Sequence, residues 1–367
     1  MMGCFCRFGL ISLLFFFISL FPFSSFADSS LVGVCGMQGP QSKFGKSVVS
    51  LLDYTTSRAY FVMSNSNPTP SNPSGNGEIY IFDSTLPINA YTIQSPQITF
   101  MGPAGGNNFG NGLLNVGDID SDGVEDIAVS DGTSLYLLSG SGIIGSQPFS
   151  NALIGTLAPT VVAGSDLGSS MALLDPAQVI FAVNDPAAMG SRIHIIQASA
   201  TGLSEIANID LFYASGLVGA NAGIVIKAGD IDGDAIKDLV VGSPNEATLV
   251  PAPFGPLTSV GAIAVLDGNS LLTQTPSLLA PIYFPSQPEQ DEGFGSSIAV
   301  SESFDLSSFG LSTSESVIAV GAPNRGNPNT STPETGGIEL LRYDSVSGNI
   351  SLISSFAANV ASQSYFG

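Results

Sequence analysis

Hydrophobic residues along the chain fall into short runs that are separated by Gly, Pro, Asn and Ser. Runs of this kind, bounded by turn residues, predict β-strands rather than helices. One type of run recurs, because it opens on a glycine and continues as a mostly apolar stretch. Its glycines are Gly45, Gly110, Gly168, Gly223, Gly295 and Gly367, at intervals of 55 to 72 residues. These intervals suit a repeated unit of four strands with loops of variable length.

The rest of each unit follows the same order. A turn or loop leads to a second strand that ends in a tight corner, a third strand follows, and a weaker fourth strand closes the unit. The pattern predicts an all-β protein, a β-propeller with five complete repeats near residues 44–108, 109–166, 167–221, 222–293 and 294–365 and the start of a sixth. Separate β-sandwich domains are the alternative, but each usually needs about 100 residues, so the interval favours propeller blades.

The most informative polar stretch separates the first two strands of the second unit. It reads Asp-Ile-Asp-Ser-Asp-Gly-Val-Glu-Asp from Asp118 to Asp126. Ca²⁺ takes oxygen ligands in irregular geometry, and alternating Asp side chains on a tight turn can surround one ion. Gly123 allows the positive φ that the turn needs. The expected ligands are the side chains of Asp118, Asp120, Asp122 and Asp126 and the carbonyl of Val124. Position twelve is Val129 in a predicted strand, which excludes an EF-hand.

The same loop returns in the fourth unit, and two copies in matching positions indicate a shared function. Its expected ligands are Asp230, Asp232, Asp234, the carbonyl of Ile236, and Asp238. Ala235 replaces the turn glycine, and a left-handed non-glycine residue costs roughly 1–2 kcal/mol. The alternative is a solvated acidic hairpin without an ion. It leaves unexplained why like charges crowd together with only Lys237 nearby.

The net charge narrows the classes of partner. The chain has 367 residues, a formal net charge of −21 and only 11% charged residues. So acidic a balance argues against nucleic acid, whose phosphates need Lys and Arg, and against anionic membranes. It suits a secreted protein that meets millimolar calcium.

Residues 1–27 are predicted to form a signal peptide. Arg7 is followed by an apolar core over 10–21, and Ser25-Phe26-Ala27 has the pattern of a cleavage site. An uncleaved anchor is the alternative, although the apolar run is shorter than the roughly 20 residues of a membrane span. We expect a secreted or cell-surface mature chain, residues 28–367, without a direct membrane span. It retains Cys35 alone, so no internal disulfide is expected.

Three motifs together carry a resemblance to a known family. Phe294-Gly295, the two acidic loops and Gly321-Ala322-Pro323 resemble the FG-GAP repeats of the integrin alpha-subunit N-terminal β-propeller. The resemblance covers residues from about 31 to 367. It implies a calcium-binding propeller that mediates adhesion or binds an extracellular protein or glycan ligand, and it allows for a partner subunit.

The chain also departs from that family. The family's propeller usually has seven blades, whereas five complete units are found here. Units one and three have only Asp53 and Asp175 where acidic loops would lie, and the long 301–316 segment replaces the loop in unit five. Residues 31–39 resemble an outer strand that would complete the last blade. We therefore expect an incomplete propeller, with a truncated reading frame as one origin; a five-bladed closure is the alternative.

Catalytic motifs do not occur in the sequence. His194, the single histidine, lies within a third-strand pattern and is expected to be a packed or edge residue. There is no nucleophile elbow around a serine, no His-Glu-x-x-His motif and no P-loop. We therefore predict a binding protein without enzymatic activity. Two alternatives stay open: a hydrolase that uses carboxylates on the propeller, and a structural module truncated from a larger secreted protein.

Overall fold

The computed structural model describes most of the chain from residue 44 to residue 357. The described residues are 44–66, 76–84, 96–103, 108–161, 166–187, 191–211, 215, 217, 222–246, 248–249, 256–257, 260–286, 288–289, 291–305, 314–325, 336–344 and 347–357. The predicted signal peptide, Cys35, the predicted outer strand over 31–39 and the final Phe366-Gly367 lie outside these residues.

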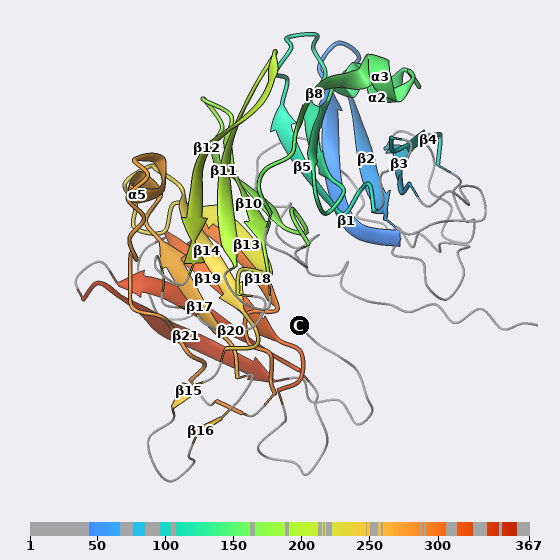
Figure 1. Cartoon of the computed structure of the whole chain (residues 1–367). Coiled ribbons are helices and arrows are strands. Elements are labelled where there is room, and N and C mark those ends of the chain that lie inside the picture. The colour runs from blue at the N-terminus through green and yellow to red at the C-terminus, as the bar shows by residue number, and fades with distance from the viewer. Residues whose placement is uncertain are drawn as a thin grey trace, which may run out of the picture.

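The described part of the chain is all-β, as predicted, and its strands form five main antiparallel sheets in sequence order (Figure 1). Sheet 1 contains β1 (Phe44–Asp53), β2 (Arg58–Asn65), β3 (Glu78–Asp83) and β4 (Ile98–Met101). Sheet 2 contains β5 (Gly112–Gly117), β6 (Asp126–Ser130), β7 (Leu135–Leu138) and β8 (Leu153–Leu157). Sheet 3 contains β9 (Met171–Asp175), β10 (Ile180–Asp185), β11 (Arg192–Ser199) and β12 (Gly202–Asp210).

Sheet 4 contains β13 (Val225–Gly229), β14 (Asp238–Ser243) and β17 (Ala262–Leu266), with a separate ribbon of β15 (Thr248–Leu249) and β16 (Pro256–Leu257). Its predicted fourth strand is reduced to single bridges, in which Leu278 pairs with Leu266 and Tyr283 with Ile263. Sheet 5 contains β18 (Ser297–Asp305), β19 (Ser314–Ala322), β20 (Gly337–Asp344) and β21 (Asn349–Ala357). The described parts of the 301–316 segment belong to β18 and β19, whose pairing extends to Asp305 and Ser314.

The sheets contact one another through their first strands. β1 contacts β5, β5 contacts β9, β9 contacts β13, and β13 contacts β18. Four of the five sheets run in simple order from the first strand to the fourth. In Figure 1 the sheets follow one another from blue to red. This order of contacts is consistent with a propeller-like arrangement in which the first strands lie innermost.

The repeated glycine has one conformation in all five units. Gly45, Gly110, Gly168, Gly223 and Gly295 have φ values between 69° and 92°. In four of them the N–H donates to a carbonyl near the end of the second strand, at Ser130, Asn184, Gly242 and Gly321, over 2.8–3.0 Å. A Cβ at this position would make the left-handed backbone conformation energetically unfavourable. The recurring glycine therefore marks the turn at which the chain enters each inner strand.

The apolar residue before that glycine packs between neighbouring sheets. Phe109, Leu167 and Phe294 are all fully buried. Phe109 lies in one cluster with Ile79 of sheet 1 and Ile127 of sheet 2. Burial of a Phe side chain contributes roughly 2–3 kcal/mol. The apolar residue before the glycine thus holds units two, three and five against the sheet that precedes each of them.

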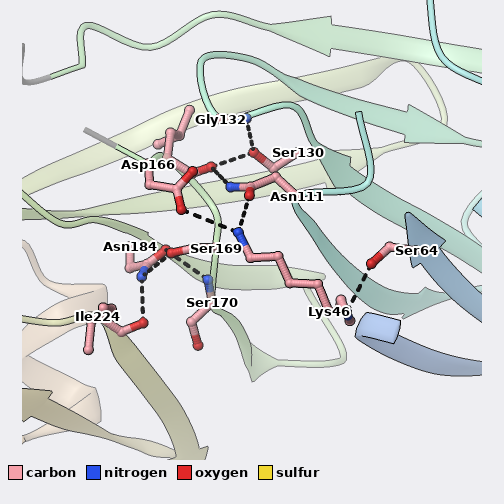
Figure 2. Close-up of polar contacts among 12 residues, drawn as sticks. Lys46, Ser64, Asn111, Ser130, Gly132, Asp166, Ser169, Ser170, Asn184 and Ile224 are labelled. Carbon is pink, nitrogen blue, oxygen red and sulfur yellow. Dashed lines mark hydrogen bonds and ion pairs between the residues drawn. The ribbon is translucent and has the colours of Figure 1, made fainter. Parts of the chain in front are cut away.

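Polar side chains join neighbouring sheets at the end where the glycine turns lie (Figure 2). The Asn111 amide donates to the Leu167 carbonyl over 3.2 Å, and Lys46 contacts both Asn111 and Asp166. The Asn184 amide donates to the carbonyls of Gly223 and Ile224, each at 3.0 Å. These bonds link sheets 1, 2, 3 and 4 directly.

Within the described residues lie three short helices that were not expected from the sequence: α2 (Gly140–Ile144), α3 (Phe149–Ala152) and α5 (Gly268–Leu272). Ser139 and Asp267 are the N-cap residues of α2 and α5, and their side chains accept from the N–H groups of Gly142 and Asn269. In the described part of the chain no helix has the length and apolar character to cross a membrane.

Gly261 lies where the backbones of sheet 4 and the following unit approach closely. Its φ is +90°, and a Cβ there would overlap the Phe294 carbonyl oxygen. Gly348 also has a positive φ, at +67°, but nothing lies within 4 Å of a Cβ there. We predict that Gly348→Ala costs about 1–2 kcal/mol, and that Gly261→Ala costs at least about 2 kcal/mol more. Urea unfolding of the two variants measures this difference, and equal losses would contradict the predicted overlap.

Candidate metal centres

The first acidic loop joins β5 to β6 and brings three carboxylates together. Oxygens of Asp118, Asp120 and Asp126 lie within 4.8 Å of one another. Ca²⁺–oxygen distances of about 2.4 Å place two ligand oxygens of one ion no more than about 4.8 Å apart. Asp126 is fully buried, Asp118 half-buried and Asp120 exposed. The group therefore has the spacing for one cation, with a buried and an open side.

Backbone donors shape the loop around Asp118. Its Oδ1 accepts from the Asp122 N–H at 3.1 Å, and its Oδ2 accepts from the Gly123 N–H at 3.0 Å. Gly123 has a φ of +89°, as expected, and Ser121 also lies in the left-handed region at +63°. The chain thus turns twice within three residues, which brings Asp118 and Asp120 to the same side as Asp126.

Asp126 is anchored by two N–H groups from different segments. Its Oδ2 accepts from Ile119 in the loop at 2.8 Å, and its Oδ1 accepts from Gly140 at the start of α2 at 2.9 Å. A Cβ on Gly140 would overlap the Glu125 carbonyl oxygen. Burial raises the pKa of Asp126 to about 6. Its anionic form is therefore disfavoured unless a cation lies beside it.

The second loop, between β13 and β14, repeats this construction. Oxygens of Asp230, Asp232 and Asp238 lie within 4.8 Å of one another. The buried Asp238 accepts from the N–H groups of Ile231 and Gly268, each at 2.9 Å, and Gly268 begins α5. Burial raises the pKa of Asp238 to about 7. The same anchor therefore occurs in sheets 2 and 4.

Ala235 has the left-handed backbone that the sequence suggested. Its φ is +71°, and the φ of Gly233 is +87°. Gly233 corresponds to Ser121 of the first loop, and Ala235 corresponds to Gly123. Both loops therefore use the same two left-handed positions, and each has glycine at only one of them.

The fifth position of each loop lies outside the group of three. The exposed Asp122 accepts from the Ser139 hydroxyl at 3.2 Å and from the Ser141 hydroxyl, and its other oxygen accepts from the Val124 N–H at 2.9 Å. The exposed Asp234 accepts from the Ile236 N–H at 2.8 Å. Asp234 is held by a local turn, and Asp122 by a local turn and by the two hydroxyls that follow β7. The regular spacing of Asp residues did not reveal these bonds.

The carbonyls of Val124 and Ile236 were predicted ligands at the seventh position. Val124 pairs with Asp53 of sheet 1 in a single bridge. The two hydrogen bonds around this pair use the Gly123 carbonyl and the Glu125 N–H. The Val124 carbonyl is therefore not used by the bridge.

Gly140 and Gly268 are the contributors that the sequence analysis missed. Both follow the third strand of their sheet, in the segments Leu138-Ser139-Gly140-Ser141 and Leu266-Asp267-Gly268-Asn269. A cap residue, a glycine and a small polar residue directly after a buried strand are the signal that could have indicated them. Their long sequence separation from Asp126 and Asp238 concealed the contact.

Asp53 and Asp175 close ordinary turns in sheets 1 and 3. Asp53 Oδ1 accepts from the N–H groups of Thr55 at 2.9 Å and Thr56 at 3.1 Å. Asp175 Oδ1 accepts from Ala177 at 2.8 Å and Gln178 at 3.1 Å. Each carboxylate takes the position that the acidic loop occupies in sheets 2 and 4.

His194 is packed, as expected. It is fully buried, with Nδ1 2.7 Å from Glu205 and Nε2 3.2 Å from Asp185. Burial alone lowers the pKa of His194, but the bonds to Asp185 and Glu205 outweigh it, so the pKa is raised. The imidazole joins β10, β11 and β12 within sheet 3.

Arg325 forms a second buried cluster, in sheet 5 and the segment before it. Its Nε lies 2.7 Å from Glu292, and its Nη1 lies 3.1 Å from Glu339. All three side chains are buried, so the pairs are shielded from solvent. The cluster holds the corner between β19 and β20.

A scan against protein-family models gives no match for this chain. A search of curated proteins gives no match either.

The titration of Asp126 and Asp238 allows the assignment of these two buried carboxylates to be tested in the absence of a metal. An unfolded Asp has a pKa of about 3.9, whereas the folded values are about 6 and about 7. Between pH 4 and 7 the folded state therefore holds more protons than the unfolded state, and the free energy of unfolding falls as pH rises. We predict this fall in EDTA, and a smaller fall in saturating calcium, because the ion replaces the protons.

Urea unfolding across this pH range measures both slopes. The Asp126→Asn/Asp238→Asn double variant is the control, since it lacks both titrations and should show a shallower slope in EDTA. A slope in EDTA that is the same in the wild type and the double variant would contradict the assignment.

Proposed function

We propose that this protein is an exported, calcium-binding β-propeller of the FG-GAP type that binds a macromolecular ligand. One observation carries the proposal: equivalent acidic loops in sheets 2 and 4 each gather three carboxylates, one of which belongs to a buried aspartate anchored by two N–H groups. Two independent copies of one anchor are better explained by a shared ion than by two solvated turns.

The donor set favours calcium among common metal ions. Each group of three consists of carboxylates alone, and Zn²⁺ sites usually include His or Cys. Mg²⁺ needs near-octahedral geometry at about 2.0–2.1 Å, whereas Ca²⁺ accepts the irregular arrangement of a loop. In the wild type Asp118, Asp120 and Asp126 would hold one ion, and Asp230, Asp232 and Asp238 would hold the other. The remaining ligands would come from the carbonyls of Val124 and Ile236, the exposed Asp122 and Asp234, and water.

We assign the ions a structural role and assign ligand binding to other loops. Each ion neutralises crowded carboxylates and fixes the hairpin between the first two strands of its sheet. Loops on a rigid scaffold are where binding surfaces commonly lie. The resemblance to integrin alpha subunits favours adhesion to an extracellular protein or glycan, with a partner subunit. We propose no catalytic role for His194, which is enclosed by Asp185 and Glu205.

Terbium luminescence tests the metal sites. Tb³⁺ substitutes for Ca²⁺ and emits when a nearby aromatic side chain is excited, and this chain has no Trp. Glu125, burial and Asp118 raise the pKa of Tyr54, and burial with Asp232 and Asp238 raises that of Tyr343, so one tyrosine lies near each loop. We predict calcium-displaceable emission that falls by roughly half in Tyr54→Phe and in Tyr343→Phe.

Tyr60→Phe is the matched control, because Tyr60 lies in the apolar core of sheet 1. It should leave the emission unchanged. The Asp120→Ala/Asp232→Ala double variant should lose most of it. Full emission from that variant, or none from the wild type, would exclude the proposed sites.

Glycan and extracellular-protein arrays test the binding role. We predict that the fluorescently labelled mature chain binds a restricted set of array components, and that EDTA weakens this binding at least about tenfold because the loops no longer hold the scaffold. The Asp120→Ala/Asp232→Ala variant should behave like the EDTA sample. Calcium-independent hydrolysis of arrayed glycans would instead favour the hydrolase alternative.

A further inference from the structure

We infer that ion binding in each acidic loop stabilises the hydrogen bonds between that loop and a neighbouring sheet, which we call the joint. One ion would then hold sheet 1 against sheet 2, and the other would hold sheet 5 against sheet 4. This inference rests on the proposed calcium sites. It goes beyond them because the effect of the ion would extend outside its own hairpin, into sheets that supply no ligand.

The first loop forms backbone hydrogen bonds with sheet 1. The Tyr54 N–H donates to the Gly123 carbonyl at 2.8 Å, and the Glu125 N–H donates to the Leu52 carbonyl at 3.0 Å. Gly123 and Glu125 flank Val124, whose carbonyl is a proposed ligand. The segment that closes around the ion is therefore also paired with the end of β1 and the turn that follows it.

The Glu125 side chain strengthens this joint. One carboxylate oxygen accepts from the Leu52 N–H and the Asn115 amide, each at 2.7 Å, and the other accepts from the Tyr54 hydroxyl at 2.8 Å. Asn115 also donates to the Ser50 carbonyl at 2.7 Å. Glu125 directly precedes Asp126 in the chain. A displacement of the loop would therefore disturb several bonds between sheets 1 and 2.

The second loop makes its joint with sheet 5. The Asp230 N–H donates to Glu302 at 3.3 Å, and Lys237 pairs with the same carboxylate at 3.4 Å. The Ser316 hydroxyl donates to the Asp230 carbonyl. Lys237 stands at the eighth position, where the first loop has Glu125. The charge at this position is reversed, and the partner is the following sheet instead of the preceding one.

Repulsion among carboxylates connects the ion to these joints. Without a cation, like charges within 4.8 Å favour a more open loop, and opening moves the backbone of Gly123, Glu125 and Asp230. With the ion bound, the loop is fixed and its bonds to the neighbouring sheet persist. Such coupling is reciprocal, so loss of the joint must weaken ion binding by the same factor.

The joints on either side of sheet 3 provide an internal reference. Asn111 donates to Leu167 between sheets 2 and 3, and Asn184 donates to Gly223 and Ile224 between sheets 3 and 4 (Figure 2). These bonds involve residues at the glycine turns and not the acidic loops. Ile119 of the first loop packs against the apolar cluster that sheets 2 and 3 share, a contact that is not directional. Calcium should therefore change the hydrogen-bonded amides of sheet 3 less than those of sheets 1 and 5.

Hydrogen exchange of the full mature chain, in calcium and in EGTA, tests the coupling. We expect calcium to slow amide exchange about tenfold in residues 50–56 and 298–302, in addition to the loops, and to leave β11 unchanged. Slowing that is confined to 118–126 and 230–238 would overturn the inference while leaving the calcium sites intact. Absence of terbium or calcium binding would instead overturn the proposed function.

Glu125→Ala and Glu302→Ala serve as matched controls for each other. Glu125→Ala should reduce the calcium effect on residues 50–56 and preserve it in 298–302, because the side-chain bonds are lost while the backbone bonds of Tyr54 and Glu125 remain. Glu302→Ala should do the reverse. Each should weaken terbium binding at its own loop by up to about tenfold, as reciprocity requires. If both variants keep the wild-type exchange pattern, the coupling is wrong. If either variant does not fold, the wild-type comparison with β11 still decides.

Discussion

Face-to-face packing between neighbouring sheets is the interaction on which the rest of this structure depends. Each inner strand contacts the inner strands of the sheets beside it, and the apolar side chains of two sheets form shared clusters. Phe109, Leu167 and Phe294 lie in these clusters, and the glycine after each one turns the chain into the next inner strand. The turn and the buried side chain thus act together in units two, three and five.

Apolar packing of this kind is not directional, so it fixes the distance between sheets better than their register. Polar contacts at the two ends of the inner strands supply direction. Asn111, Asn184 and Lys46 lie at the end where the inner strands begin (Figure 2), and Glu125 and Glu302 lie at the opposite end, beside the acidic loops. At the second end the two acidic loops each gather three carboxylates, in a chain with 30 acidic and nine basic side chains. A bound cation is the simplest means of offsetting their charge.

The repeat, the strands and the acidic groups could be predicted because their signals are local. A glycine before an apolar run and an Asp at every second position can be read from a few adjacent residues. The short helices, the Gly140 and Gly268 anchors and the contacts of Glu125 could not, because each joins segments far apart in the chain. Asp122 differs for another reason: its side chain accepts from the nearby Val124 N–H and the distant Ser139 and Ser141 hydroxyls. Only the folded geometry shows these bonds, and that Asp122 lies outside the group of three carboxylates.

The two left-handed positions in each acidic loop have a consequence for how such loops are recognised. The first loop has serine at position four and glycine at position six, whereas the second has glycine and then alanine. One glycine in either place is therefore enough to build the turn. A search pattern that demands glycine at the sixth position would find one of these hairpins and overlook its structural twin.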